Sequence, residues 1–304
     1  YPSYMIINDH VLYVAYKNAS SHNDGGGLGS FSIYSDELIL NNNYNSSGRS
    51  YTHLCVDDKK HYLFAANYHV GATASYRLEN KTITQKLCAV HHKGLGPDLL
   101  KRQTGPHAHC VGITPDKQFV YSVDLGADKV VMYRYHQGIL LEDVNYTLNV
   151  IPGSGPRHMI FSKDGRFAYL VNEIANNIMV FKYVDGHFSL IQAIHCIPRH
   201  FKGFSSASAI RLTSSGEHLF VSNRGHDSIA MYRVNTETGK LALLYMVHTG
   251  KGPRDFNIID DQYLIVGCQD DNKLQVLTFD EENEKLLLSD SQFQIVAPVC
   301  ITFE

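Results

Sequence analysis

The sequence predicts an all-β protein, a seven-bladed β-propeller of four-stranded antiparallel blades, and two observations support this. First, one pattern recurs six times: an apolar strand, a tight turn, a second apolar strand and a polar residue. Second, successive copies are 46 to 57 residues apart, and a period near 50 built from short strands is typical of propeller blades. The polar residues that mark the copies are Lys17, Asn67, Asp124, Asn172, Asn223 and Gln269.

The fourth copy shows the strands expected of one blade. Its first two apolar runs flank Lys163-Asp-Gly165, a hairpin-turn sequence, and Asp185-Gly186 turns the chain between the last two. The expected strands cover residues 159–161, 167–171, 178–183 and 188–191. The fifth copy repeats this plan, with its third strand over 228–233 and its fourth over 241–244. Capped helical periodicity is hard to find, so the class is all-β.

The end of the chain predicts a seventh, incomplete blade. Residues 297–304 match only the start of another repeat, so we expect one domain over 1–304 with six full repeats and the innermost strand of a seventh. Propellers commonly close by completing one blade with strands from both termini. We therefore expect the other strands of that blade to precede Tyr1, in roughly 40 further residues of the natural polypeptide.

Composition excludes several partner classes. The chain has 44% hydrophobic and 19% charged residues with a net charge of −3, which gives no basic face for nucleic acid. No apolar run is long enough to span a bilayer. The six cysteines show no paired spacing, which fits buried thiols in a reducing compartment. We expect a cytoplasmic protein, a monomer or weak homodimer.

The repeat register also predicts which side chains converge. The residues that open the innermost strands are Ser3, Thr52, His109, Arg157, Ser208, Arg254 and Val299, and those that follow the repeated polar residue are Asn18, Tyr68, Leu125, Glu173, Arg224 and Asp270. Innermost strands run parallel around a propeller axis, so the charged members of both sets should face one opening. Any one of them could instead form a salt bridge between blades, or cap a turn. Their concentration in repeats three to six favours a binding site, and paired arginines suit carboxylate or phosphate.

Other chemistries are poorly supported. The 17 histidines lack the spacing of a known metal site, and no setting for a nucleophilic Ser or Cys occurs. The glycine cluster 25–29 lacks the strand-to-helix context of a phosphate loop, so we expect a flexible hairpin tip there. A set of His, Glu and Arg without a nucleophile suits acid–base work on an activated carbonyl.

Five motifs resemble one enzyme family. They are Gly105-Pro-His-Ala-His109, Ser154-Gly-Pro-Arg-His158, Tyr169-Leu-Val-Asn-Glu173, Val221-Ser-Asn-Arg-Gly-His-Asp-Ser-Ile229 and Pro253-Arg-Asp-Phe256. Across nearly the whole chain the sequence resembles bacterial 6-phosphogluconolactonases of the seven-bladed propeller type, relatives of the fungal carboxy-muconate lactonizing enzymes. The resemblance implies a cytoplasmic enzyme that hydrolyses 6-phospho-D-glucono-1,5-lactone, a small phosphosugar lactone, to 6-phospho-D-gluconate in the pentose phosphate pathway, with no metal or organic cofactor.

The resemblance also carries over the catalytic residues His109, Arg157, Glu173 and Arg224. The residues expected to bind substrate beside them are Arg254, His107, His158, His226, Tyr68 and Asn67. Whether His109 or Glu173 takes the proton from the attacking water stays open, as does the orientation of the phosphate. Two alternatives remain: a cycloisomerase that closes a muconate to its lactone, and a non-catalytic propeller that serves as an interaction scaffold.

Overall fold

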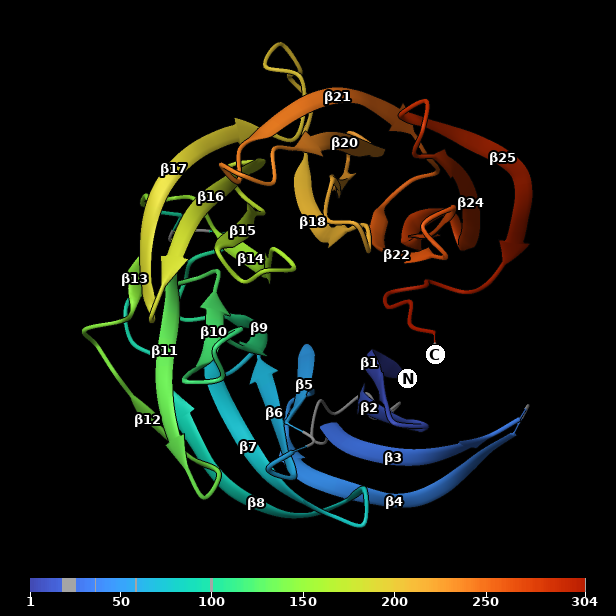
Figure 1. Ribbon diagram of the computed structural model, residues 1–304. Coiled ribbons are helices and arrows are strands. Elements are labelled where there is room, and N and C mark those ends of the chain that lie inside the picture. Colours follow the sequence, from blue (N-terminus) through green and yellow to red (C-terminus); the bar gives the residue numbers. More distant parts are fainter. Residues whose placement is uncertain (18–25, 36, 58, 99–100, 304) are drawn as a thin grey trace. The chain divides into compact units, whose positions relative to one another are not determined.

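The computed structural model describes residues 1–17, 26–35, 37–57, 59–98 and 101–303. Most of these residues lie in antiparallel sheets (Figure 1). The chain divides into two compact units, one of Tyr1–Gly155 with Thr302–Glu304 and one of Pro156–Ile301. Each unit holds three sheets. The expectation of a single domain over 1–304 stays a prediction.

In the first unit, neighbouring strands of each sheet follow one another in the chain, and the first strands β1, β5 and β9 adjoin in that order. A short extra strand, β13, pairs with β11. The strands are β1 (Pro2–Asn8), β2 (Val11–Lys17), β3 (Gly26–Tyr34) and β4 (Glu37–Gly48); β5 (His53–Asp57), β6 (Tyr62–Asn67), β7 (Ala72–Glu79) and β8 (Thr82–His91); β9 (Ala108–Ile113), β10 (Val120–Asp124), β11 (Lys129–His136), β12 (Ile139–Glu142) and β13 (Leu148–Asn149).

The second unit repeats this order, and its first strands β14, β18 and β22 adjoin in turn. A single 3-10 turn, η1 (Gln269–Asp271), follows β23. The strands are β14 (Pro156–Phe161), β15 (Phe167–Asn172), β16 (Asn177–Val184) and β17 (His187–His195); β18 (Ser206–Leu212), β19 (His218–Arg224), β20 (Ser228–Val234) and β21 (Leu241–His248); β22 (Pro253–Ile259), β23 (Tyr263–Cys268), β24 (Lys273–Asp280) and β25 (Lys285–Gln294).

The six full repeats are confirmed as six antiparallel sheets, but the start of a seventh blade is not formed in the described part of the chain. The expected strand over 297–304 is wrong for residues 297–303, which belong to no strand. Side chains satisfy part of this segment's backbone in place of a ladder partner: the Ile301 amide donates to Asp255 Oδ2 at 2.9 Å, and the Asn257 side chain donates to the Ile301 carbonyl at 3.3 Å.

Burial falls from the first strands of a sheet to the last. Every residue of β15 is buried, whereas β17 of the same sheet is mostly exposed or half-buried. The continuous apolar run of β15 follows from this, because a strand covered on both faces has no solvent side to alternate with. The predicted turn is also confirmed: the amide of Gly165, at φ +74°, donates to the Ser162 carbonyl at 2.9 Å.

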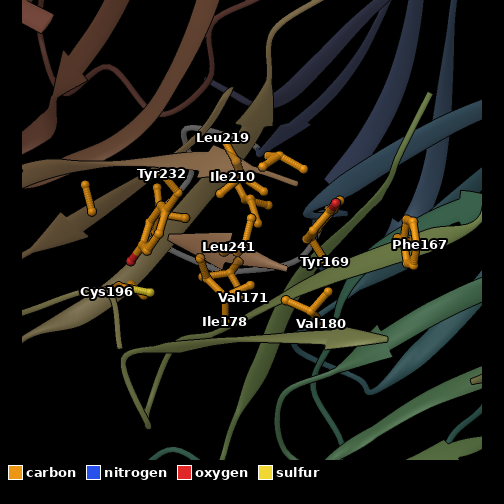
Figure 2. Packing of buried hydrophobic residues seen from close by; sticks show 14 residues of the cluster. Phe167, Tyr169, Val171, Ile178, Val180, Cys196, Ile210, Leu219, Tyr232 and Leu241 are labelled. Atoms are coloured by element: carbon orange, nitrogen blue, oxygen red, sulfur yellow. The ribbon is translucent and has the colours of Figure 1, made fainter. Parts of the chain in front are cut away.

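The apolar cores lie between neighbouring sheets. One core of the second unit joins β15 and β16 to the strands β18 to β21 of the next sheet, and its buried members include Tyr169, Val171, Leu219 and Tyr232 (Figure 2). Tyr232 also donates from its hydroxyl to the His195 carbonyl at 2.7 Å. Neighbouring sheets are therefore held together mainly by apolar area removed from water.

The glycine cluster 25–29 differs from its prediction. Gly25 lies outside the described residues, and Gly26 to Gly29 begin β3 instead of forming a hairpin tip. The reason is close packing, since a Cβ on Gly27 would overlap the ring of Tyr16. Within the described residues, no helix is long and apolar enough to cross a membrane.

Replacing Leu219 with alanine should lower the free energy of unfolding by about 2–5 kcal/mol, the usual cost of a cavity in a packed core. Leu219 is fully buried between two sheets. Leu243→Ala is the control, because Leu243 is 42% exposed. Denaturant titration followed by circular dichroism measures both variants, and equal losses would contradict this account of the core.

Candidate active site

A bulge in the first strand of several sheets carries the predicted ring residues. Between Pro156 and His158, β14 has one residue more than the facing stretch of β15, and the extra residue is Arg157. A bulge re-aims the side chain of its extra residue and is frequent beside active sites. The corresponding extra residues of β1, β9 and β22 are Ser3, His109 and Arg254.

In the second unit, Glu173 joins two of the predicted arginines. Its Oε2 atom lies 3.1 Å from Nε of Arg157 and 2.9 Å from Nη2 of Arg224. The Glu173 and Arg157 side chains are 2% and 4% exposed, against 18% for Arg224. Glu173 directly follows β15 and Arg224 ends β19, so the repeat register places them as predicted.

Burial and neighbouring charges act on Arg157 in opposite directions. Burial is the largest cause, and with the charge of Arg224 it lowers the pKa of Arg157 to about 9, while the Glu173 carboxylate opposes the shift. Arg254 lowers this pKa further and Asp255 raises it. Even so, the Arg157 guanidinium keeps its charge at neutral pH. Two further cations thus act on the charge of Arg157 beside a buried carboxylate, an arrangement that favours a bound anion.

His158 and Arg254 lie within this group. Nη1 of Arg157 is 3.1 Å from Nε2 of His158, and a guanidinium can only donate, so the ring nitrogen accepts. The Arg254 carbonyl accepts a 2.6 Å hydrogen bond from Ser208 Oγ, which ties β22 to β18. The geometry of the second unit therefore brings Arg157, Glu173 and Arg224 into contact as predicted, and places Arg254 close enough to act on the charge of Arg157.

His226 lies in the turn between β19 and β20. Its Nδ1 atom is 2.7 Å from Ser228 Oγ, and its ring meets Phe201 edge-on at 4.7 Å and His248 at 5.2 Å. Burial first, and the neighbouring His248 next, lower the pKa of His226. The role of His226 in substrate binding stays a prediction.

The first unit holds the remaining predicted residues. The rings of Tyr68 and His107 stack at 4.3 Å, and His109 meets Tyr68 edge-on at 5.8 Å. His107 Nδ1 is 2.9 Å from the Tyr68 carbonyl, and Arg102 donates to the Tyr68 hydroxyl at 3.2 Å. Tyr68, His107 and His109 therefore form one polar–aromatic group, and their proposed contact with substrate stays a prediction.

Asn67 has the turn-capping role that the sequence left open. Its Oδ1 atom accepts from the amides of His69 at 3.2 Å and Val70 at 3.4 Å, and its Nδ2 donates to the Arg49 carbonyl at 2.8 Å. Asn18, the first member of the second predicted set, lies outside the described residues. Among the described members of that set, Tyr68, Glu173 and Arg224 have side-chain contacts that bear on a site.

The structure adds Ser206, which the sequence reasoning missed. Its Oγ accepts from Nη2 of Arg224 at 2.7 Å, so that one nitrogen donates to both Ser206 and Glu173. Ser206 pairs with Arg224 across β18 and β19. The contact follows from the pairing of the two strands, but finding it from the sequence requires their register to the single residue.

Three comparisons bear on the family. The model of a lactonase family, a seven-bladed β-propeller, matches residues 1–303. The 6-phosphogluconolactonase of Bacillus subtilis is 34% identical over 99% of this chain and 87% of its own length. Among solved structures, a periplasmic gluconolactonase of Pseudomonas aeruginosa is 28% identical with a TM-score of 0.91 over 98% of this chain and 86% of its own. A solved structure of a Lactobacillus plantarum protein is 30% identical, with a TM-score of 0.91 over 98% of this chain and 86% of its own.

Replacing Glu173 with glutamine should lower the free energy of unfolding by about 3–5 kcal/mol, because the buried Arg157 and the partly exposed Arg224 lose their counter-charge. Sulfate should then raise the melting temperature more in the variant than in the native protein, since it replaces part of that charge. The control is Glu237→Gln, at an exposed position of the same unit. Differential scanning calorimetry with and without sulfate measures both effects; a variant as stable as the native protein would contradict the role given to Glu173.

Proposed function

The chain belongs to the lactonase family of seven-bladed β-propellers, and we propose that it hydrolyses 6-phospho-D-glucono-1,5-lactone to 6-phospho-D-gluconate. The observation that carries the proposal is the buried Glu173 carboxylate, which pairs with both Arg157 and Arg224, with Arg254 close enough to act on the charge of Arg157. The substrate has a dianionic phosphate at one end and an ester carbonyl at the other. Such a molecule needs one cationic anchor and one donor for the oxyanion.

Arg224 and Arg254 are assigned to the phosphate. Arg224 is partly exposed, and Ser206 and Glu173 both hold its Nη2 atom. Its Nε atom is buried without a hydrogen-bond partner among the described residues. A buried donor of this kind is normally satisfied by a ligand or water. A guanidinium held in this way can bind phosphate with little loss of side-chain entropy.

Arg157 is assigned to the oxyanion that forms when water adds to the lactone carbonyl. Donors fixed in a water-poor site stabilise such a charge more than donors in bulk water do. Arg157 is 3% exposed and held by Glu173 and His158. The bond between the carbonyl carbon and the ring oxygen then breaks, and the ring oxygen takes a proton. The reaction consumes one lactone and one water.

Glu173 is assigned to hold the arginines, and His109 stays the candidate base. Protonating Oε2 of Glu173 would cost its ion pairs with both Arg157 and Arg224, so that oxygen is poorly placed to accept a proton from water. Of the two candidates that the sequence leaves open, His109 is therefore assigned as the general base. We also propose a cytoplasmic location, which suits the six thiol cysteines.

Replacing Arg157 with alanine should lower the lactonase kcat at least about tenfold, a modest part of what one lost oxyanion donor can cost. The rate of acid release is followed at constant pH, after subtracting spontaneous hydrolysis, and circular dichroism confirms the fold. Arg166→Ala, at a 55% exposed side chain, is the control and should keep the native rate. An unchanged kcat in Arg157→Ala would remove this residue from the reaction.

Replacing Arg224 with alanine should reduce the preference for the phosphorylated lactone over glucono-1,5-lactone by about 10- to 100-fold, mainly through KM, since a charged hydrogen bond contributes about 1.5–3 kcal/mol. Steady-state kinetics with both lactones measure this. The native protein is also assayed with a carboxy-muconate. Ring closure of the muconate without hydrolysis of either lactone would favour the cycloisomerase, and turnover of none would favour the scaffold.

A further inference from the structure

One residue in the turn between the second and third strands has a left-handed backbone in each of the five sheets whose turn at this place is described. Its φ lies between 50° and 59° at Gly71, Asp128, Asn176, Asp227 and Asn272. In each case its carbonyl accepts a hydrogen bond of 2.8 to 3.0 Å from the amide directly after a strand of the same sheet. That strand is β13 for the donor Val150 and the fourth strand for the donors His92, Cys196, Thr249 and Ile295. This residue thus has a structural task shared by the repeats.

Two of these five residues are aspartates, and both hold a glycine that precedes Pro-Arg in the sequence. The amide of Gly155 donates to Asp128 Oδ1 at 2.8 Å, and the amide of Gly252 donates to Asp227 Oδ1 at 2.9 Å. Asn176 and Asn272 also hold the segment that follows their sheet, but neither segment contains Gly-Pro-Arg. The turn residue is therefore an aspartate in the two sheets that are followed by Gly-Pro-Arg, the motif that carries Arg157 or Arg254.

Asp227 connects the two arginines assigned to the phosphate. The Oδ1 atom that accepts from Gly252, two residues before Arg254, also accepts from the Gly225 amide at 3.0 Å. Gly225 directly follows Arg224. One oxygen thus joins the end of β19 to the start of β22.

Other contacts leave the start of β22 little freedom. Gly252 has φ +66°, and a Cβ there would overlap the Asp270 side chain. The Gly252 carbonyl accepts from the Gln269 amide at 2.9 Å. Ser208 then fixes the Arg254 carbonyl at 2.6 Å. The hydrogen bonds of Asp227 differ from these contacts, because they also hold Gly225, the residue directly after Arg224.

We infer that Asp227 is a positioning residue that sets the separation of Arg224 and Arg254, and so tunes the site for the phosphate of the substrate. The inference rests on the proposed function for the identity of the anion. Asp227 itself has its contacts with backbone amides, so it acts through the arginines. A displacement of about 1 Å in such an anchor can cost orders of magnitude in rate or binding.

The test compares Asp227→Gly with Asn272→Gly. Glycine keeps the left-handed backbone without strain, so each variant loses only the side-chain hydrogen bonds. Asp227→Gly should raise the KM for the phosphorylated lactone about tenfold. The KM for glucono-1,5-lactone should stay within about twofold of the native value. Asn272→Gly should change neither KM. Asp227→Asn retains an acceptor oxygen and tolerates this backbone, so it should recover KM to within about threefold of the native value.

A second measurement needs no turnover. In protein labelled with nitrogen-15, the Nε–H signals of Arg224 and Arg254 should shift in Asp227→Gly and stay in place in Asn272→Gly. Unshifted signals in Asp227→Gly, or equal KM changes for both lactones, would overturn the inference. An inactive native protein would refute the proposed function, and the arginine signals would still decide whether Asp227 positions the two side chains.

Discussion

The contact on which the candidate site depends is the one between the Glu173 carboxylate and two guanidinium groups. Arg224 and Arg254 both act on the charge of the buried Arg157, and this repulsion in a medium of low dielectric would be costly without a compensating charge. A single oxygen of Glu173 meets both Arg157 and Arg224. The carboxylate offsets only part of the positive charge, so the group retains an excess that a substrate anion can neutralise.

The fold supplies the geometry of this contact through repetition. Each sheet presents the start of its first strand and the end of its second at the same place in the repeat, and the bulges add one extra residue there. In the second unit, side chains from two neighbouring sheets can therefore meet without long loops. The apolar cores between the sheets hold these strand ends in place, because the first strands are buried on both faces.

Much of this could be predicted from the sequence because a repeat converts spacing into position. Arg157, Glu173 and Arg224 were expected together, and they are. The bulge at Arg157 and the partner Ser206 could not be predicted, since both depend on strand register to a single residue. The strand expected over 297–304 is not formed over residues 297–303, because a short apolar segment forms a strand only with a backbone partner. His226 follows Arg224 by two residues, yet its ring turns toward Phe201, because loop contacts decide where such a side chain points.

The most direct test of this account is a crystal structure of the protein with 6-phosphogluconate, the stable product. The phosphate should lie against Arg224 and Arg254, and an oxygen of the new carboxylate should lie within hydrogen-bond distance of Arg157. Glu173 should keep both of its arginine contacts. A product bound away from these three arginines, or one bound with its phosphate on Arg157, would contradict the account.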